Sequence, residues 1–244
     1  MNGVRRPRLV GELVIVALLV LVYDRVRDFS GARPARAIEN AQHVLGLERL
    51  THIGVEHAAN DWLAAHRLIE DVASWYYQLA HLTVTLLVLL WVWWRRAAGY
   101  RALRNVLIGI NVIALAVFWV FPVAPPRLLP AGGYIDSAVV SGVVDRTTTV
   151  APDLYAAMPS LHAAWAVWVM VALFRLSRSR FVRGAGVLHF ALTCVVVTAT
   201  ANHYLADVAA GAGLTAVVLA LVRRVGEAPE LVPEPRTAVT ASTG

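Results

Sequence analysis

Six long apolar segments constrain what this chain can fold into more than any other feature of its sequence. The chain has 244 residues, 58% of them hydrophobic, and a mean hydropathy of +0.61, which is more apolar than a soluble domain of this size needs to be. Most of the segments approach the roughly 20 residues that a helix needs to cross a bilayer. They cover residues 9–23, 72–94, 103–121, 158–174, 185–201 and 204–222. The sequence therefore predicts an all-α, polytopic membrane protein, with a six-transmembrane-helix bundle in one domain over residues 1–226.

The distribution of positive charge predicts how these helices are oriented. All 22 basic residues are arginine, and the net charge is +6. With the N-terminus inside the cell, most arginines lie on the inner side, and the short loops around Arg101 and Arg180 are especially dense. Both termini are then cytoplasmic and the protein lies in the cell membrane. Because the charge follows membrane topology, it does not indicate a nucleic-acid partner.

The first apolar segment has a second interpretation. It is the shortest, it contains Glu12, and Arg5, Arg6 and Arg8 precede it, as they would in a cleaved signal peptide. Residues 35–37 (Ala-Arg-Ala) are a distant candidate for the cleavage site. We favour an uncleaved helix, because charged residues separate the apolar run from that candidate.

Three stretches are too polar or too broken to span a membrane. In residues 33–71 the apolar side chains recur at helical spacing, which predicts one or two helices that lie on the outer leaflet or cap the bundle. Residues 122–157 are rich in proline and glycine and are expected to form an extracytoplasmic loop. The tail over residues 227–244 is rich in Pro, Glu, Thr and Ser, which predicts a disordered cytoplasmic segment.

Five polar residues meet at the outer face of this six-helix arrangement. Arg127 follows the third apolar segment, Ser160 and His162 open the fourth, and His203 and Asp207 open the sixth. Nothing in the count of charges required this convergence. It supports both the topology and a functional site at the outer face.

The residues around the fourth segment are suited to binding an anion. Pro159 fits the first turn of a helix, where its missing N–H has no cost. Ser160 offers a hydroxyl beside backbone N–H groups that have no partner within the helix, and a helix N-terminus favours a phosphate group. Arg127 adds a permanently charged planar fork that matches phosphate oxygens.

The two histidines are suited to transferring the phosphoryl group. His203 and Asp207 are one helical turn apart, so the carboxylate can accept a hydrogen bond from one ring nitrogen. The other nitrogen is then left unprotonated, as an oriented nucleophile or base. His162, from another helix, can protonate the leaving oxygen.

Each of these residues also has a structural interpretation. Asp207 can complement the dipole of its helix, Ser160 can serve only as a helix cap, and a histidine at a helix end is commonly an interfacial polar residue. The prolines that precede Arg127 can simply shape a loop. One by one we would prefer these interpretations. Together, at one face of the membrane, the residues favour function.

Three motifs resemble a known family. The segments 122–127 (Pro-Val-Ala-Pro-Pro-Arg), 156–162 (Ala-Ala-Met-Pro-Ser-Leu-His) and 203–207 (His-Tyr-Leu-Ala-Asp) resemble the signature motifs of the type 2 phosphatidic acid phosphatase (PAP2) superfamily. They look closest to the branch that includes the inositol phosphorylceramide synthases. The resemblance runs from Tyr76 to about Gly211, and the second and third motifs are specific in combination.

The resemblance implies a fold, a reaction and a set of roles. The family is a six-helix bundle that cleaves or transfers a phosphoryl group through a phosphohistidine, without a metal or another cofactor. The resemblance therefore implies that the substrate of this protein is a lipid phosphate or a polyprenyl phosphate. Carried over by motif, the catalytic residues are His203 as nucleophile, Asp207 as its orienting carboxylate and His162 as general acid and then base; the phosphate-binding residues are Arg127, Ser160 and the Leu161 backbone N–H.

The sequence departs from the family pattern at two places. Many members have a lysine upstream of the first-motif arginine, and this chain has none. Many also have a Ser-Arg pair before the third-motif histidine, where this chain has residues 196–200 (Val-Val-Thr-Ala-Thr). Hydroxyl groups or an arginine such as Arg146 must then help Arg127. The synthase-like branch shares this reduced pattern, so transfer to a polyol acceptor such as inositol is as plausible as hydrolysis.

The remaining histidines give weaker signals. His43, His52, His57 and His66 have no regular metal-binding spacing, so solvated or capping roles are favoured over a zinc site. His189 is expected near the inner face, away from the chemistry. One more histidine, within the second apolar segment, could back the active site or form a hydrogen bond across the bundle: His81.

Two alternatives from other classes stay open at this point. A small transporter could use His81, His162, His203 and Asp207 as a proton relay, although these groups gather at one face and do not line a path across the membrane. An inactive structural relative is the other alternative, because of the missing arginine. Turnover of phosphate that depends on His203 separates the enzyme from both.

Overall fold

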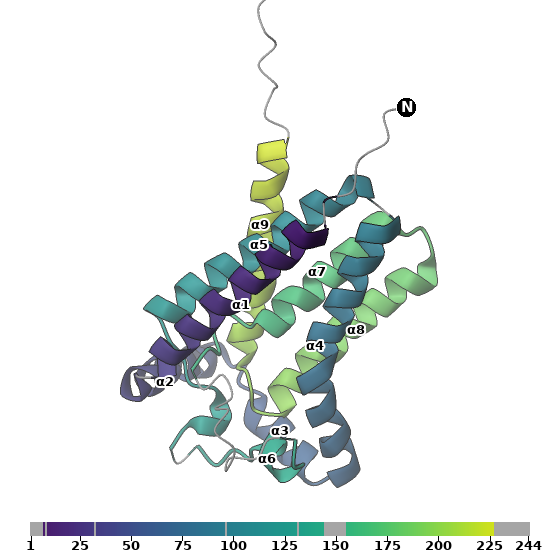
Figure 1. Cartoon of the computed structure of the whole chain (residues 1–244). Helices are drawn as coiled ribbons and strands as arrows, with labels where there is room; N and C mark the ends of the chain where they lie inside the picture. The colour runs from purple at the N-terminus through teal and green to yellow at the C-terminus, as the bar shows by residue number, and fades with distance from the viewer. Residues whose placement is uncertain are drawn as a thin grey trace, which may run out of the picture.

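The computed structural model describes residues 7, 9–31, 33–95, 97–130, 132–143 and 155–226. Within this part of the chain the secondary structure is helical, apart from an isolated β-bridge between Val123 and Ala156. Figure 1 shows the start of α1 and the end of α9 at one end of the bundle, with α2, α3 and α6 at the opposite end. The helices are α1 (Leu9–Gly31), α2 (Pro34–Thr51), α3 (Glu56–Ala64), α4 (Arg67–Arg95), α5 (Ala97–Val120), the 3₁₀ turn η1 (Pro126–Leu128), α6 (Ser137–Val140), α7 (Leu161–Leu176), α8 (Arg180–Ala199) and α9 (Leu205–Gly226).

Four of these helices are long and apolar enough to cross a membrane. They are α4, the Gly99–Val120 part of α5, α8, and the Leu205–Arg223 part of α9. The apolar stretch Leu9–Leu19 in α1 and the 16-residue α7 are shorter. At 1.5 Å per residue α7 is roughly 24 Å long, below the ~30 Å of a typical hydrocarbon core. The all-helical, multi-pass architecture is confirmed, and the count of six spans stays a prediction.

Helix α7 lies against α4, α5, α8 and α9. Small side chains on α7, among them Ala164 and Ala172, are fully buried and let neighbouring backbones come close. Trp168 is also fully buried, and its indole N–H donates to the Leu103 carbonyl of α5 at 2.9 Å. Helices α7 and α9 approach closely at Gly211, where an added Cβ would lie 2.2 Å from the Ser160 carbonyl oxygen. The starts of α7 and α9 are therefore held in fixed register.

Helix α2 caps the end of the bundle that carries the polar motifs. Its buried alanines Ala37 and Ala41 pack with Val44 against a cluster that includes Val123, and the Val123–Ala156 bridge joins the two loops beneath it. The Ala124 N–H donates to the Ala37 carbonyl at 3.0 Å. Of the two placements expected for residues 33–71, capping is therefore the one observed. Contact of their exposed side chains with the outer leaflet stays a prediction.

Several expected boundaries are shifted. Helix α4 begins at Arg67, inside the stretch assigned to the outer helices, because Glu70 and Ser74 of its first turns are buried under α6 rather than solvated. The expected start of the fourth helix at residue 158 is wrong: Ser160 is the N-cap of α7, and Pro159 precedes it. The tail 227–244 lies outside the described residues.

Candidate functional site

His203 lies in the tight turn between α8 and α9, before the helix begins. Its ring Nδ1 is 2.9 Å from the carbonyl oxygen of Ala157. A carbonyl oxygen can only accept, so Nδ1 carries the proton and donates it. In the neutral ring the lone pair is then on Nε2. The ring is largely buried, at 4% exposure, and is one of the side chains that line an apolar cavity between α1, α4 and α5.

Ala157 was not expected as a site residue, and its position depends on residues far away in the sequence. The Ala157 N–H donates to the Val123 carbonyl at 3.1 Å, beside the isolated bridge. Val123 lies in the cluster that α2 covers, and the Asn40 side chain of α2 donates to the Pro122 carbonyl at 2.8 Å. The loop that orients His203 is thus held by the capping helix.

His162 faces His203 directly. Nδ1 of His162 lies 3.3 Å from Nε2 of His203. Because Nε2 of His203 carries the lone pair, Nδ1 of His162 is the donor. The ring of His162 stacks on Tyr77, with centroids 4.4 Å apart, and lies against His81, with centroids 4.0 Å apart. His81 therefore lies beside the candidate acid His162. This position agrees with the expectation that His81 backs the active site.

Asp207 supports the turn more than it orients the ring. It is fully buried, and its Oδ2 accepts the Tyr204 N–H at 3.0 Å, in the manner of a capping box. The same oxygen is 3.5 Å from Nδ1 of His203, farther than the Ala157 carbonyl. The main-chain carbonyl of Asp207 accepts the Ser160 N–H at 3.0 Å, which joins the starts of α7 and α9.

Arg127 lies in the 3₁₀ turn η1 and lines the same cavity as His162 and His203. Its backbone N–H donates to the Ala201 carbonyl in the turn before His203, at 3.0 Å. Its side-chain Nε is 3.6 Å from Oδ2 of Asp136, and both side chains are largely buried. Asp136 is thus a further residue of the site that sequence analysis did not find.

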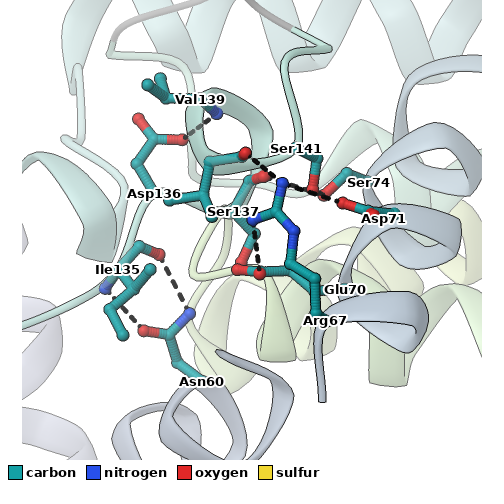
Figure 2. A network of polar contacts seen from close by, with 11 residues as sticks. Asn60, Arg67, Glu70, Asp71, Ser74, Ile135, Asp136, Ser137, Val139 and Ser141 are labelled. Carbon is teal, nitrogen blue, oxygen red and sulfur yellow. Dashed lines mark hydrogen bonds and ion pairs between the residues drawn. The ribbon is translucent and has the colours of Figure 1, made fainter. Parts of the chain in front are cut away.

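The segment that carries Asp136 is fixed by the polar network in Figure 2. The Asn60 side chain of α3 accepts the Ile135 N–H at 2.7 Å and donates to the Ile135 carbonyl at 3.1 Å. The hydroxyl of Ser74 donates to the Ser137 carbonyl at 3.1 Å, and Arg67 forms ion pairs with the carboxylates at the start of α4. These contacts hold Asp136, the N-cap of α6, against the candidate phosphate-binding arginine.

The start of α7 is the element that the sequence predicts to bind an anion. The Ser160 hydroxyl accepts the Ala163 N–H at 3.3 Å and so acts as a cap. A hydroxyl that accepts one hydrogen bond can still donate another. The N–H groups of Leu161 and His162 are in the first turn, where a helix offers no internal partner. Both side chains line the cavity.

The cavity continues from this polar end into the apolar part of the bundle. Its volume is about 570 Å³, and its walls come chiefly from α1, α4 and α5. Tyr100 and Phe118 of α5 both line it. At 1.5 Å per residue they are roughly 27 Å apart along the helix. Near Tyr100 the Glu12 carboxylate accepts from the Tyr100 hydroxyl at 2.8 Å and pairs with Arg104.

The structure thus brings Arg127, Leu161, His162 and His203 to one cavity, with Ser160 and Asp207 buried directly behind them. Arg146 lies outside the described residues. Away from the site, His189 of α8 is within hydrogen-bond distance of the Tyr76 hydroxyl, at 2.9 Å. Among the described residues no group of three or more His, Cys, Asp and Glu side chains is arranged to hold a metal.

The fold and the site define a class: a multi-pass helical membrane protein with two facing histidines and an arginine at one end of an apolar cavity. The family comparison agrees. The model of the PAP2 superfamily matches residues 42–221, so the chain belongs to this superfamily. Membership indicates phosphatase or phosphotransferase activity on a phosphorylated substrate in a membrane protein. No curated protein and no solved structure matches the chain.

Proposed function

We propose that this protein transfers the phosphoryl group of a lipid phosphate or polyprenyl phosphate through a phosphohistidine formed on His203. The observation that carries the proposal is the hydrogen bond from His203 Nδ1–H to the Ala157 carbonyl. It puts the lone pair of the ring on Nε2, on the side of the cavity and of His162. A nucleophile and a proton carrier are then paired in one site.

In the first half-reaction His203 Nε2 attacks phosphorus. A P–N bond forms, and the bond from phosphorus to the lipid oxygen breaks. His162, as the imidazolium with a proton on each ring nitrogen, gives its Nδ1 proton to that oxygen and becomes the neutral ring, and the dephosphorylated lipid leaves. In the second half-reaction His162 takes a proton from water or an alcohol, whose oxygen attacks phosphorus. The P–N bond breaks, and the His203 lone pair is restored.

The resting contact between the two rings has a mechanistic consequence. At 3.3 Å, Nε2 of His203 and Nδ1 of His162 are in direct contact. A phosphoryl group in line between nucleophile and acid needs the rings to move apart. The substrate therefore replaces the His162–His203 hydrogen bond, which keeps the nucleophile protected until a phosphate enters.

The phosphate charge is met by Arg127 and the start of α7 in this proposal, without a metal. Arg127 supplies a fork of N–H donors, and its carboxylate partner Asp136 holds it in place. Leu161 N–H and the Ser160 hydroxyl add donors at the positive end of a helix. Asp207 acts through the turn that it caps, as a positioning residue for His203.

The apolar cavity supports a lipid substrate. It begins at His162 and His203 and is lined farther in by leucine, isoleucine and valine side chains of α1, α4 and α5. A phosphorylated head group at the histidines would place a hydrocarbon chain along this wall. With both termini cytoplasmic, the site faces the outside of the cell membrane, where an outer-leaflet lipid can enter from the side.

Transfer to a polyol is the second form of the proposal, and the region before His203 bears on it. The hydroxyl of Thr200 donates to the Val196 carbonyl at 2.7 Å, so it is used within α8 and does not replace the missing arginine. Asn202 is the neutral side chain from this region that lines the cavity. A site with less positive charge suits a neutral acceptor such as inositol, as in the inositol phosphorylceramide synthase-like branch.

The decisive experiment compares His203→Ala with the wild type on phosphatidic acid and polyprenyl phosphates, with and without inositol and in the presence of a chelator. His43→Ala is the matched control, because His43 is exposed on α2. We expect His203→Ala to lose at least about 10³-fold in turnover. The wild type should accumulate an acid-labile, alkali-stable phosphoryl adduct that the variant lacks. Phosphate turnover that survives in His203→Ala would rule out the proposed nucleophile.

A further inference from the structure

Two buried carboxyl groups from outside the motifs reach the start of α9. Oε1 of Glu48, in the last turn of α2, accepts the Ala206 N–H at 2.7 Å. Oε1 of Glu56, the first residue of α3, accepts the Leu205 N–H at 2.7 Å. Glu48 is fully buried and Glu56 is 1% exposed. Neither glutamate lies in a signature motif, and the mechanism above does not use them.

These contacts complete the hydrogen bonding of the α9 N-terminus. A helix leaves its first N–H groups without internal partners. In α9 three successive N–H groups, those of Tyr204, Leu205 and Ala206, each donate to a carboxyl oxygen. The turn that they form is the one that carries His203 and Asp207. Its position relative to the rest of the site depends on groups that α2 and α3 supply.

The approach of the two glutamates follows from the local sequence. Ala37, Ala41, Val44 and Glu48 recur at spacings of four and three, so Glu48 continues the buried stripe of α2. His52 ends α2 in a left-handed conformation, with φ of 56°, and turns the chain. After this turn α3 begins with Glu56, which brings both carboxyl groups to the same helix end.

The charge balance of this cluster favours one bound proton. Oε2 of Glu48 is buried with no hydrogen-bond partner among the described residues. The pKa of Glu48 is raised to about 7, chiefly by burial. The hydrogen bond from the Ala206 N–H lowers this pKa, and the negative charges of Glu56 and Asp207 raise it. Tyr134 and Tyr204 also face the cluster, and burial raises the pKa of each, so both stay neutral. Arg49, which is exposed, is a cation near Tyr134.

We propose that Glu48 and Glu56 form a carboxyl clamp that positions the His203 turn for catalysis, and that Glu48 holds a proton while the clamp is closed. The inference rests on the proposed function, and it adds two positioning residues that act through the backbone of α9. The clamp closes when Glu48 is protonated. The N-terminus of α9 then faces two carboxylates, those of Glu56 and Asp207, rather than three.

The clamp makes both stability and activity depend on pH. The folded-state pKa of Glu48 lies above its ordinary value of 4.5. The folded protein therefore holds a proton that the unfolded chain releases, and this group's contribution to stability falls as the pH rises from about 4.5 to about 7. Above about 7 the three carboxylates repel one another, the turn loosens, and we expect activity to fall.

Three variants test the clamp on the full-length protein in nanodiscs. Glu48→Ala removes the acceptor, and we expect kcat to fall by about 10- to 100-fold while KM changes less than threefold. Glu48→Gln keeps an acceptor for the Ala206 N–H and is uncharged, as the protonated acid is. It should retain at least half of the wild-type kcat and lose the fall in activity above about pH 7. Glu39→Ala, at an exposed position of α2, should behave as wild type.

Amide deuterium exchange of a peptide that includes Leu205 and Ala206 gives a readout independent of activity. We expect exchange there to rise at least about tenfold in Glu48→Ala and to stay unchanged in Glu48→Gln. Unchanged exchange and kcat in Glu48→Ala would overturn the clamp, as would an alkaline limb that persists in Glu48→Gln. If no substrate gives His203-dependent turnover, the proposed function fails, and the exchange result still decides whether the clamp exists.

Discussion

The two helix N-termini that form the site carry opposite chemistry. At α9 the first-turn N–H groups are occupied by the carboxyl groups of Glu48, Glu56 and Asp207. At α7 the first turn carries no acidic residue, and the cap is the neutral hydroxyl of Ser160. Both helices begin beside a histidine, and the Ser160 N–H to Asp207 carbonyl bond joins them.

This difference assigns two separate tasks to the two helix ends, which are holding the proposed nucleophile and binding the phosphate. The motifs alone do not distinguish these tasks. The first N–H groups of α9 are occupied by the chain's own acids, so this end anchors the turn of the proposed nucleophile and does not attract a phosphate. The N-terminus of α7 keeps its positive potential beside Arg127, so it is the end that suits an anion. Each prediction below either breaks the alignment of the two ends or changes the charge of one.

The largest effect among the changes that test this comparison is expected from Gly211→Ala, which forces the two ends apart. The added Cβ would lie 2.2 Å from the Ser160 carbonyl oxygen, and neither backbone can yield without shifting a helix. A displacement of about 1 Å in a catalytic constellation can cost on the order of 10²-fold, so turnover should fall by at least that much. Thermal unfolding and turnover should be measured together.

Gly213→Ala is the matched control for this variant. It makes the same change two residues later in α9, where an added Cβ has no neighbour within 4 Å. Alanine also favours a helix over glycine by about 1 kcal/mol, so this control should be as stable as wild type or more stable. Equal turnover in the two variants would show that the α7–α9 contact does not set the geometry of the site.

Removing Arg127 tests the positive end. In Arg127→Ala a bound phosphate still contacts the N–H groups at the start of α7, but it loses the charge-assisted hydrogen bonds from the guanidinium. We therefore expect kcat/KM to fall by roughly 10- to 100-fold. Arg49→Ala is the control at the other helix end. Arg49 is exposed and follows Glu48 in α2, beside the clamp that holds the start of α9. If both variants lose the same activity, the phosphate is not bound preferentially at α7.

The helices and the core of the site could be predicted from the sequence, because both depend on local signals. Apolar runs of nearly membrane-spanning length mark helices wherever they occur. The His203–Asp207 spacing and Ser160 before an apolar run are likewise readable along the chain. The structure places these residues together, although it assigns Ser160 and Asp207 to capping contacts as well.

The partners that hold the site could not be predicted, because they come from distant segments. The Ala157 carbonyl that fixes the tautomer of His203 leaves no trace in residue type. Asp136 reaches Arg127 only because α6 docks on α3 and α4. Glu48 alone gave a signal: an acidic residue on the apolar stripe formed by Ala37, Ala41 and Val44 is costly to bury and calls for a buried partner.

The smallest effect, and the sharpest test of the comparison, comes from giving α7 the kind of cap that α9 has. Ser160→Asp places a carboxylate at the N-cap, and Ser160→Asn places a neutral side chain of the same shape there. Both residues cap helices about as well as serine, and because Ser160 is fully buried, thermal unfolding of both variants should be measured beside their KM. The added negative charge should repel a bound phosphate, so KM should rise on the order of tenfold in Ser160→Asp but not in Ser160→Asn. Because the two variants differ only in charge, equal KM values would mean that the phosphate does not bind at the α7 N-terminus, and the division of tasks between the two helix ends would be wrong.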